Sequence, residues 1–215
     1  MSSCRYTDDL RTVIAARLAG FNVIRRSSAA ELKPAAVAIA IVALEERAGT
    51  PEAAFLLTAR ATRLRAHSGQ LALPGGRVDS GETIEQAALR ELSEELGIDL
   101  APAAIIGRLD DYPTRSGYLI SPIVVWTPPD TVARPNGAEV AEVYRVPLTE
   151  LRRHDSPEIF AIPESDRPVI RLSLAPIEGY VNAPTAAVLY QFREVALEGR
   201  PTRVDHFDQP VWAWR

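Results

Sequence analysis

The segment AAVAIAIVALE (Ala35–Glu45) restricts the possible folds of this 215-residue chain more than any other feature. It is a continuous apolar run, rich in Val and Ile, that ends at its single charged residue. An unbroken apolar run of this length is typical of a strand that is buried on both faces. A membrane-spanning helix needs about 18 apolar residues, and no run in the sequence approaches that length. We therefore predict that Ala35–Glu45 is a buried central strand.

The other patterned segments predict a mixed fold around that strand. Gly- and Pro-containing breaks separate short runs that favour extended backbone. The predicted strands are Ala54–Arg60, Leu71–Leu73, Ile105–Asp111, Leu119–Trp126 and Val143–Val146. The predicted helices cover Asp8–Leu18, the segment between Thr83 and Gly97, and Thr185–Leu197. Strands mixed with helices in this way imply an α/β (α+β) sandwich.

The length suits one well-buried domain with short appendages. We expect an N-terminal helix and linker over residues 1–30, a main domain over 31–200, and a C-terminal tail over 201–215. The polar stretch Arg25–Pro34 is the predicted linker. In the aromatic tail, Trp212 and Trp214 flank Ala213 at strand spacing, and we expect the tail to pack on the domain or on a partner.

The composition argues against several classes of protein. A net charge of −4 and a pI near 5.5 disfavour a general nucleic-acid binder, which carries a basic surplus. The single cysteine, Cys4, permits no internal disulfide, and this fits a reducing compartment. The N-terminus lacks the basic start and apolar core of a secretory signal. We expect a cytoplasmic protein that binds neither nucleic acid nor a membrane.

The segment GGRVDSGETIEQAALRELSEELGI (Gly75–Ile98) carries an excess of carboxylates. Thr83 followed by Gln86 predicts a capping box at the start of a helix, and Gly97 is placed to end that helix. At about 100° per residue, one side of the helix is apolar and is predicted to face the core. That side consists of Leu89, Leu92 and Leu96.

Three glutamates of the same helix, Glu91, Glu94 and Glu95, are predicted to cluster on a face distinct from the core-facing side. Like charges this close destabilise a helix. The penalty disappears if a hard divalent cation binds there, since Mg²⁺ takes carboxylate oxygens, waters and substrate phosphates. Arg90 can also orient or partly neutralise the cluster. The alternative interpretation is a solvated helix face, which is the usual meaning of a charge run.

The spacing of the segment favours the metal-binding interpretation. Gly76 is followed after five residues by Glu82, and seven further residues lead to RELSEELGI (Arg90–Ile98). This pattern matches the Nudix box at every specified position, and the sequence therefore resembles a Nudix hydrolase. The resemblance implies an α/β/α sandwich. It also implies hydrolysis of a nucleoside diphosphate linked to another group, with Mg²⁺ or Mn²⁺ as cofactor.

The resemblance assigns metal ligands by position in the box. Glu91 and Glu95 would be the principal ligands, and Glu94 a third or shared one. The backbone carbonyl of Gly76 would be a further ligand. Glu82 precedes the helix, so it would reach the metal from the loop as an outer or additional ligand.

The candidate catalytic residues are Glu91, Glu94, Arg90 and Glu139. A carboxylate must accept the proton of the attacking water. The resemblance implies two sources for this base: the helix glutamate at the position of Glu91, as in some family members, or a residue of a distal loop, as in others. In this chain the loop candidates are Glu139 and Glu142, for which the alternative is an ordinary surface carboxylate.

The segment LLTARATRLRAHSGQLALPGG (Leu56–Gly76) is a basic patch in an acidic protein. Guanidinium groups bind phosphate through paired donors, so the patch suits a multiply phosphorylated ligand; a solvated hairpin loop is the alternative. Its spacing is similar to the signature of coenzyme A pyrophosphatases, except that Leu73 replaces an aromatic residue. The resemblance implies that the substrate-binding residues are Arg60, Arg65, His67 and Gly69.

Together the motifs imply metal-dependent hydrolysis of coenzyme A, or a derivative, to 3′,5′-ADP and 4′-phosphopantetheine. The alternatives are a Nudix enzyme for ADP-ribose, dinucleotides or a nucleoside triphosphate, and a silent nucleotide-sensing Nudix module. The silent module is disfavoured because such modules usually lose box carboxylates. The sequence leaves open the preferred metal, the form of coenzyme A and the general base. It is compatible with a homodimer but does not specify the oligomeric state.

Overall fold

The computed structural model describes residues 4–26, 32–44, 49–61, 70–175 and 177–213. Its helices are α1 (Asp8–Gly20), α2 (Ile84–Leu96) and α3 (Thr185–Phe192), the last continued by a π-helical turn at Arg193–Leu197. Its strands are β1 (Lys33–Leu44), β2 (Glu52–Arg60), β3 (Leu71–Ala72), β4 (Gly75–Arg77), β5 (Ile105–Arg108), β6 (Tyr112–Pro113), β7 (Tyr118–Trp126), β8 (Val140–Pro147), β9 (Glu158–Ile162), β10 (Ser165–Leu172) and β11 (Val181–Asn182). Short 3₁₀ turns lie at Pro102–Ala104, Leu148–Arg152 and Val211–Ala213.

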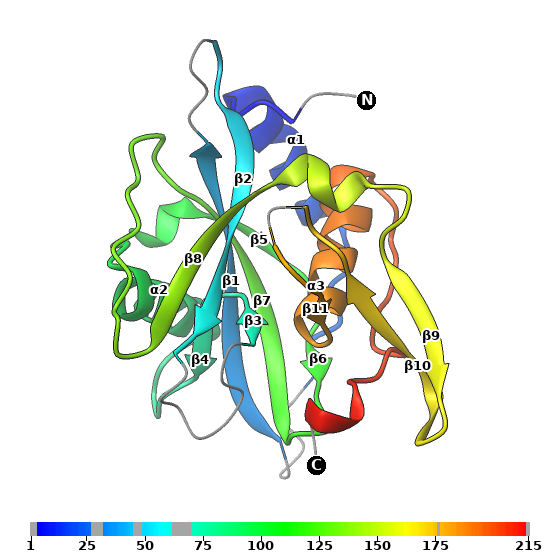
Figure 1. Cartoon of the computed structure of the whole chain (residues 1–215). Coiled ribbons are helices and arrows are strands. Elements are labelled where there is room, and N and C mark those ends of the chain that lie inside the picture. The colour runs from blue at the N-terminus through cyan, green and yellow to red at the C-terminus, as the bar shows by residue number, and fades with distance from the viewer. Residues whose placement is uncertain (1–3, 27–31, 45–48, 62–69, 176, 214–215) are drawn as a thin grey trace.

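The larger sheet is built around β1, as predicted (Figure 1). Within the described part of the chain it has eight strands, with β3-β2-β1-β7-β5 as the main order. β4 pairs with β1, β6 with β7, and β8 with β2. β1 runs parallel to β7 and antiparallel to β2, so the sheet is mixed. A second sheet of three strands has the order β11-β10-β9.

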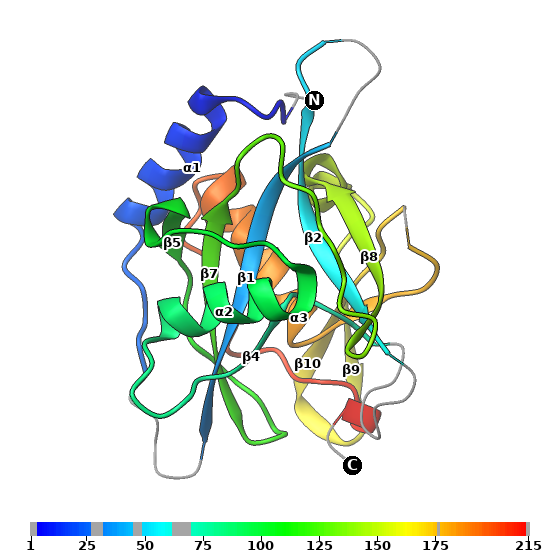
Figure 2. The same ribbon diagram turned by 90° about the vertical axis from the view of Figure 1, so that its left-hand side faces the viewer.

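Helices cover both faces of the larger sheet, with α2 in front of it and α3 behind it in Figure 2. The sequence of β1 explains this asymmetric sandwich. Ala36, Ala38 and Ala40 share a hydrophobic cluster with Leu92 and Leu96 of α2. Their small side chains allow that helix to approach closely. The predicted α/β/α sandwich is confirmed.

The opposite face of β1 carries larger side chains. Ile39 and Ile41 belong to a second cluster that contains Ile14 of α1 and Phe192 of α3. Successive strand residues point to opposite faces, so the alternation of Ala and Ile along β1 separates the two clusters. Burying each isoleucine contributes roughly 1.5–3 kcal/mol.

Several segments differ from the sequence-based prediction. Lys33 and Pro34, expected in the linker, are the first residues of β1. The first helix extends to Gly20, two residues beyond the predicted end at Leu18. The β9–β11 sheet was not predicted, because the side chains of β9 are largely exposed and give no apolar pattern.

The two ends of the chain contribute to one hydrophobic cluster with the main domain. This cluster contains Ile14 from the N-terminal segment and Val204 and Phe207 from the C-terminal segment. Trp212 lies in a 3₁₀ turn, not in an extended segment, and its side chain is 53% exposed. Trp214 lies outside the described residues. The domain boundaries proposed above therefore remain a prediction.

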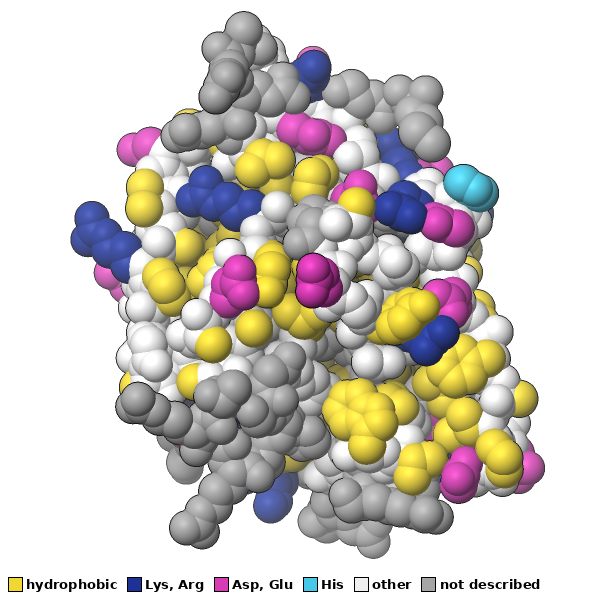
Figure 3. Space-filling view, in the orientation of Figure 1, with side chains coloured by type: hydrophobic (Ala, Val, Ile, Leu, Met, Phe, Trp, Pro, Cys, Tyr) yellow, Lys and Arg dark blue, Asp and Glu magenta, His cyan; other side chains and the backbone are white. Residues whose placement is uncertain are grey.

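An apolar surface lies on the side of the molecule formed by β9 and β10 (Figure 3). Ile159 and Phe160 on β9 and Tyr180 near β11 are exposed there. The guanidinium of Arg171 lies 3.7 Å from the ring centroid of Tyr180.

Among the described helices, none is long and apolar enough to cross a membrane.

Candidate active site

Helix α2 begins and ends as the sequence predicts. The hydroxyl of Thr83 accepts a hydrogen bond from the backbone N–H of Gln86 at 3.1 Å, and the Gln86 side chain accepts one from Thr83 N–H at 2.8 Å. Gly97 ends the helix in the left-handed conformation, with φ of +62°, a conformation that costs a glycine little. These local bonds fix where the helix begins and ends.

Glu91, Glu94 and Glu95 were predicted to cluster on a face of α2 distinct from its core-facing side, but the three side chains differ in exposure and Glu95 is buried. The side chain of Glu94 is 53% exposed and that of Glu91 only 14%. Glu95 is buried at 7% exposure. The reason is helical geometry: residues 88 and 95 are seven apart, or about 20° apart in azimuth, and Ala88 faces the core. Glu95 therefore enters the protein interior.

Arg90 binds three of the acidic residues at once. Its Nε and Nη2 donate to the two carboxylate oxygens of Glu82 at 2.9 and 3.1 Å. Its Nη1 donates to Glu91 at 2.9 Å and to Glu94 at 2.8 Å, and Nη2 also donates to the carbonyl of Arg77 at 2.9 Å. The predicted neutralising role of Arg90 thus has a specific geometry. It links the loop before the helix, strand β4 and the acidic face of α2.

Gly76 lies directly against the carboxylate of Glu91. A Cβ atom at Gly76 would be 2.6 Å from Cδ of Glu91, which is closer than real Cβ contacts. A Cβ at Gly75 would likewise be 2.7 Å from Cα of Val37 on β1. The glycine pair therefore lets β4 fit between β1 and the acidic helix. This packing was not foreseen, because the sequence suggested only a carbonyl ligand at Gly76.

Glu95 is the acidic residue that Arg90 does not reach. Its Oε2 atom is buried without a hydrogen-bond partner. Burial and the nearby charge of Glu91 raise the pKa of Glu95 to about 7, although the charge of Arg60 and the backbone of Gly75 act in the opposite direction. A buried carboxylate oxygen without a partner is costly, so this atom is suited to a cation.

Glu91 is also held in an environment that disfavours its charge. Burial raises the pKa of Glu91, the Arg90 guanidinium lowers it, and the charges of Glu94 and Glu139 raise it further. Among the described residues, no three His, Cys, Asp or Glu side chains are already arranged to hold a metal ion. Arg90 bonds one oxygen each of Glu91 and Glu94 and none of Glu95.

Glu139 reaches this region through the loop between β7 and β8, which is hydrogen-bonded to the C-terminus of α2. Asn136 N–H donates to the carbonyl of Glu95 at 2.8 Å, and Ala61 N–H donates to the carbonyl of Glu139 at 2.9 Å. The charge of Glu139 contributes to raising the pKa of both Glu91 and Glu95. Glu142 instead accepts a 2.6 Å hydrogen bond from the hydroxyl of Tyr144. The two loop candidates therefore differ in their surroundings: the charge of Glu139 acts on the helix glutamates, whereas Glu142 is hydrogen-bonded to Tyr144.

A cavity of about 470 Å³ opens beside these residues. Its lining joins Arg60, Glu95 and the glycine pair of β4, as well as Leu73, the residue that departs from the coenzyme A signature. The sequence motifs did not predict the remaining polar lining, which includes Thr58, Gln70, Arg77, Thr114, Ser116, Tyr118, Thr185 and Gln209. These residues come from segments far apart in the chain. Arg65, His67 and Gly69 lie outside the described residues.

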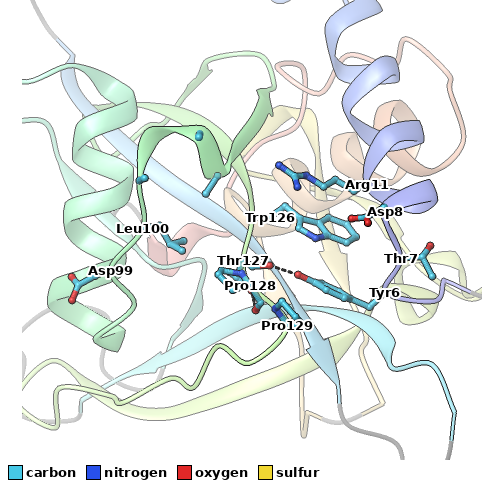
Figure 4. A pocket seen from close by; sticks show the side chains of 13 residues that line it. Tyr6, Thr7, Asp8, Arg11, Asp99, Leu100, Trp126, Thr127, Pro128 and Pro129 are labelled. Atoms are coloured by element: carbon cyan, nitrogen blue, oxygen red, sulfur yellow. Dashed lines mark hydrogen bonds between the residues drawn. The ribbon is translucent and has the colours of Figure 1, made fainter.

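A second cavity, of about 640 Å³, lies between the start of α1 and the turn before β5 (Figure 4). The rings of Tyr6 and Trp126 stack there with centroids 4.5 Å apart. The Tyr6 hydroxyl donates a hydrogen bond to the carbonyl of Thr127, drawn as a dashed line in Figure 4. None of the box glutamates lines this cavity, so the smaller one is the candidate active site.

Comparisons with known proteins identify the family of the chain. The family described as NUDIX domain matches residues 34–171. The protein named "Uncharacterized Nudix hydrolase NudL" of Photorhabdus laumondii is 42% identical over 101 residues, which make up 46% of this chain and 54% of that protein. The protein of the same name from Escherichia coli O6:H1 is 38% identical over 121 residues, or 54% of this chain and 63% of that protein.

The aligned part of the chain thus spans between half and two thirds of the length of these relatives. Among solved structures, a MutT/nudix family protein from Enterococcus faecalis is similar at 16% identity with a TM-score of 0.47. That likeness covers 74% of this chain and 53% of the other.

Proposed function

The chain belongs to the NUDIX domain family, and on this premise we propose that it hydrolyses the diphosphate bond of coenzyme A or a derivative. The products would be 3′,5′-ADP and 4′-phosphopantetheine. The match to the family and to relatives named Nudix hydrolases confirms the resemblance read from the box. The choice of coenzyme A goes beyond these comparisons and rests on the segment before the box.

The main support for the proposal is that the acidic helix α2 and the basic end of strand β2 line the same cavity. Glu95 of α2 and Arg60 of β2 both line it, and the charge of Arg60 acts on Glu95. Gly76 lines it as well, with the carboxylate of Glu91 packed behind. A diphosphate needs cations on its oxygens, and this cavity offers both an arginine and carboxylates suited to a metal ion.

The residues at this site fit a divalent cation. The partnerless buried oxygen of Glu95 is the strongest indication, because carboxylate oxygens are the ligands that Mg²⁺ and Mn²⁺ prefer. Glu91 and Glu95 would hold the cation, with Glu94, the carbonyl of Gly76 and Glu82 as further ligands. A cation bound there would neutralise the diphosphate and lower the pKa of the attacking water.

The protein's own groups supply positioning and proton transfer. Arg90 orients Glu82, Glu91 and Glu94 through its hydrogen bonds. Glu139 is the proposed acceptor of the water proton, because its loop is tied to the end of α2 and its charge acts on Glu91. Arg60 would bind phosphate oxygens through its guanidinium.

Leu73 gives the cavity an aliphatic side chain in place of an aromatic ring. Its side chain is buried and lines the cavity where the coenzyme A signature has an aromatic ring. An apolar residue at this place preserves the packing of the β3–β4 turn. Substrate recognition would therefore depend mainly on the cations of the cavity. Of the signature's basic residues, Arg60 is the one that the described structure places there.

Product analysis by mass spectrometry tests the proposal. Purified protein with Mg²⁺ or Mn²⁺ would be offered coenzyme A, ADP-ribose, a dinucleotide and a nucleoside triphosphate separately. A Glu95→Gln variant removes the partnerless carboxylate, and Glu85→Gln, whose side chain is 44% exposed on the same helix, is the matched control.

We expect 3′,5′-ADP and 4′-phosphopantetheine from coenzyme A with the wild type and Glu85→Gln, and none with Glu95→Gln. Turnover of another substrate alone would keep the metal site and reject coenzyme A. A lack of turnover of all four substrates would favour a nucleotide-sensing module.

A further inference from the structure

Besides Arg60, a second arginine lines the candidate active site, and neither sequence motif predicts it. Arg77, the last residue of β4, and Tyr118, the first of β7, both line the cavity. Nη2 of Arg77 donates a 2.9 Å hydrogen bond to the phenol oxygen of Tyr118, and the guanidinium carbon lies 5.6 Å from the ring centroid. Among the described residues, no carboxylate forms an ion pair with Arg77.

Arg77 points away from the acidic face of α2. Successive residues of a strand point to opposite sides, and the Gly76 position faces the carboxylate of Glu91. The side chain of Arg77 therefore leaves β4 on the other side. Its Cα pairs with Ala35 at the start of β1, whereas Arg60 lies at the end of β2. The two cations therefore reach the cavity from different strands.

The position of Arg77 is fixed at both its backbone and its side chain. Its carbonyl accepts a 2.9 Å hydrogen bond from Arg90, and its guanidinium is held by the Tyr118 hydroxyl. The hydroxyls of Thr114 and Ser116, which precede Tyr118, also line the cavity. A cation that is already ordered loses less side-chain entropy when it binds an anion.

We propose that Arg77 and Tyr118 bind a phosphate group of the substrate that is separate from the diphosphate to be cleaved. This inference rests on the proposed function and specifies its substrate class. The substrate is a nucleoside diphosphate derivative with an additional phosphate, such as the 3′-phosphate of coenzyme A. The guanidinium and the phenol supply N–H and O–H donors for that phosphate, and Arg60 remains beside the catalytic carboxylates for the diphosphate.

A comparison of coenzyme A with 3′-dephospho-coenzyme A tests this assignment, because the two share the diphosphate and differ in the extra phosphate. The quantity to measure is the ratio of kcat/KM for the two substrates with Mg²⁺. We expect Arg77→Gln to lower kcat/KM for coenzyme A by about 10- to 100-fold and to leave the value for the dephospho form within about twofold. Arg77→Lys should keep part of the preference, and Tyr118→Phe should reduce it by a smaller factor.

Arg153→Gln is the matched control, because Arg153 is outside this cavity and pairs with Asp155. It should leave the ratio unchanged. Equal losses on both substrates in Arg77→Gln, or a wild type that shows no preference for coenzyme A, would overturn the inference while leaving the proposed function intact. If the wild type cleaves neither substrate, the proposed function fails, and this inference fails with it.

Discussion

The backbone of Gly76 packs directly on the carboxylate of Glu91, where a Cβ atom would lie 2.6 Å from Cδ. Strand β4 and helix α2 therefore meet through a glycine and a half-buried acid. Arg90 holds the same carboxylate with a 2.9 Å hydrogen bond. The position of Glu91 is thus set by two neighbours that belong to the same sequence motif.

Replacing Gly76 with alanine should displace Glu91 and abolish most of the hydrolytic activity. We expect Gly76→Ala to lower kcat by at least about 100-fold, because misplacement of a catalytic group by about 1 Å has an effect of that size. Gly20→Ala is the control, since a Cβ at Gly20 meets nothing within 4 Å. Steady-state hydrolysis of coenzyme A checks both variants. Near-normal activity of Gly76→Ala would show that the carboxylate can move without loss.

Replacing Arg90 with lysine should destabilise the metal-free protein, because an ammonium group cannot reproduce the hydrogen bonds of the guanidinium to three carboxylates and a carbonyl. We expect the free energy of unfolding to fall by about 1–3 kcal/mol. Urea denaturation in the presence of a chelator measures this change. Arg153→Lys, at an exposed ion pair, should have a much smaller effect, and equal effects of the two variants would contradict the proposed role of Arg90.

Glu95 should make the stability of the metal-free protein depend on pH. Its pKa is about 7 in the folded state and near 4.5 without burial, so the folded state binds the proton more tightly. The stability due to the protonated form is fully present below pH 4.5 and is lost as the pH rises to about 7. Over this range the loss should be on the order of 3 kcal/mol.

Glu95→Gln removes that dependence, so the variant should become more stable than the wild type as the pH rises, up to about pH 7. Denaturation curves of both proteins at several pH values with a chelator give the difference directly. A stability difference that stays constant between pH 4.5 and 7.5 would show that Glu95 is not held in an unfavourable environment.

Glu139→Gln should slow hydrolysis far more than Glu142→Gln. Loss of a general base typically costs about 10²–10⁴ in rate, and we expect the decrease in kcat with an unchanged KM. The carboxylate of Glu142 already accepts a hydrogen bond from the Tyr144 hydroxyl, and replacement of Glu142 should change kcat less than about twofold. Comparable effects of the two variants would remove Glu139 as the proton acceptor.

The parts of the site that the sequence predicted are those determined by local contacts. The capping box of Thr83 and Gln86 involves neighbours on one turn, and Gly97 ends the helix through its own conformation. Strand β1 was predictable because burial on both faces leaves an unbroken apolar run. Such features depend on a few consecutive residues and therefore appear directly in the sequence.

The features that were missed depend on contacts between distant segments. The contact between Arg77 and Tyr118 joins residues 41 positions apart, and no spacing rule relates them. The burial of Glu95 depends on which side of α2 the sheet covers, and this is decided by the alanines of β1. The sequence-based prediction grouped Glu95 with its charged neighbours, although on the helical wheel it also lies about 20° from Ala88, and the wheel alone does not show which side the sheet covers.

Titration of Mn²⁺ into the metal-free protein, followed by the electron paramagnetic resonance signal of free Mn²⁺, tests the central claim most directly. That claim is that the carboxylates of α2 bind a divalent cation. We expect the wild type and Glu85→Gln to bind Mn²⁺ with the same affinity, and Glu95→Gln to bind at least about tenfold more weakly. Equal Mn²⁺ binding by the wild type and Glu95→Gln would contradict the assignment of the metal site.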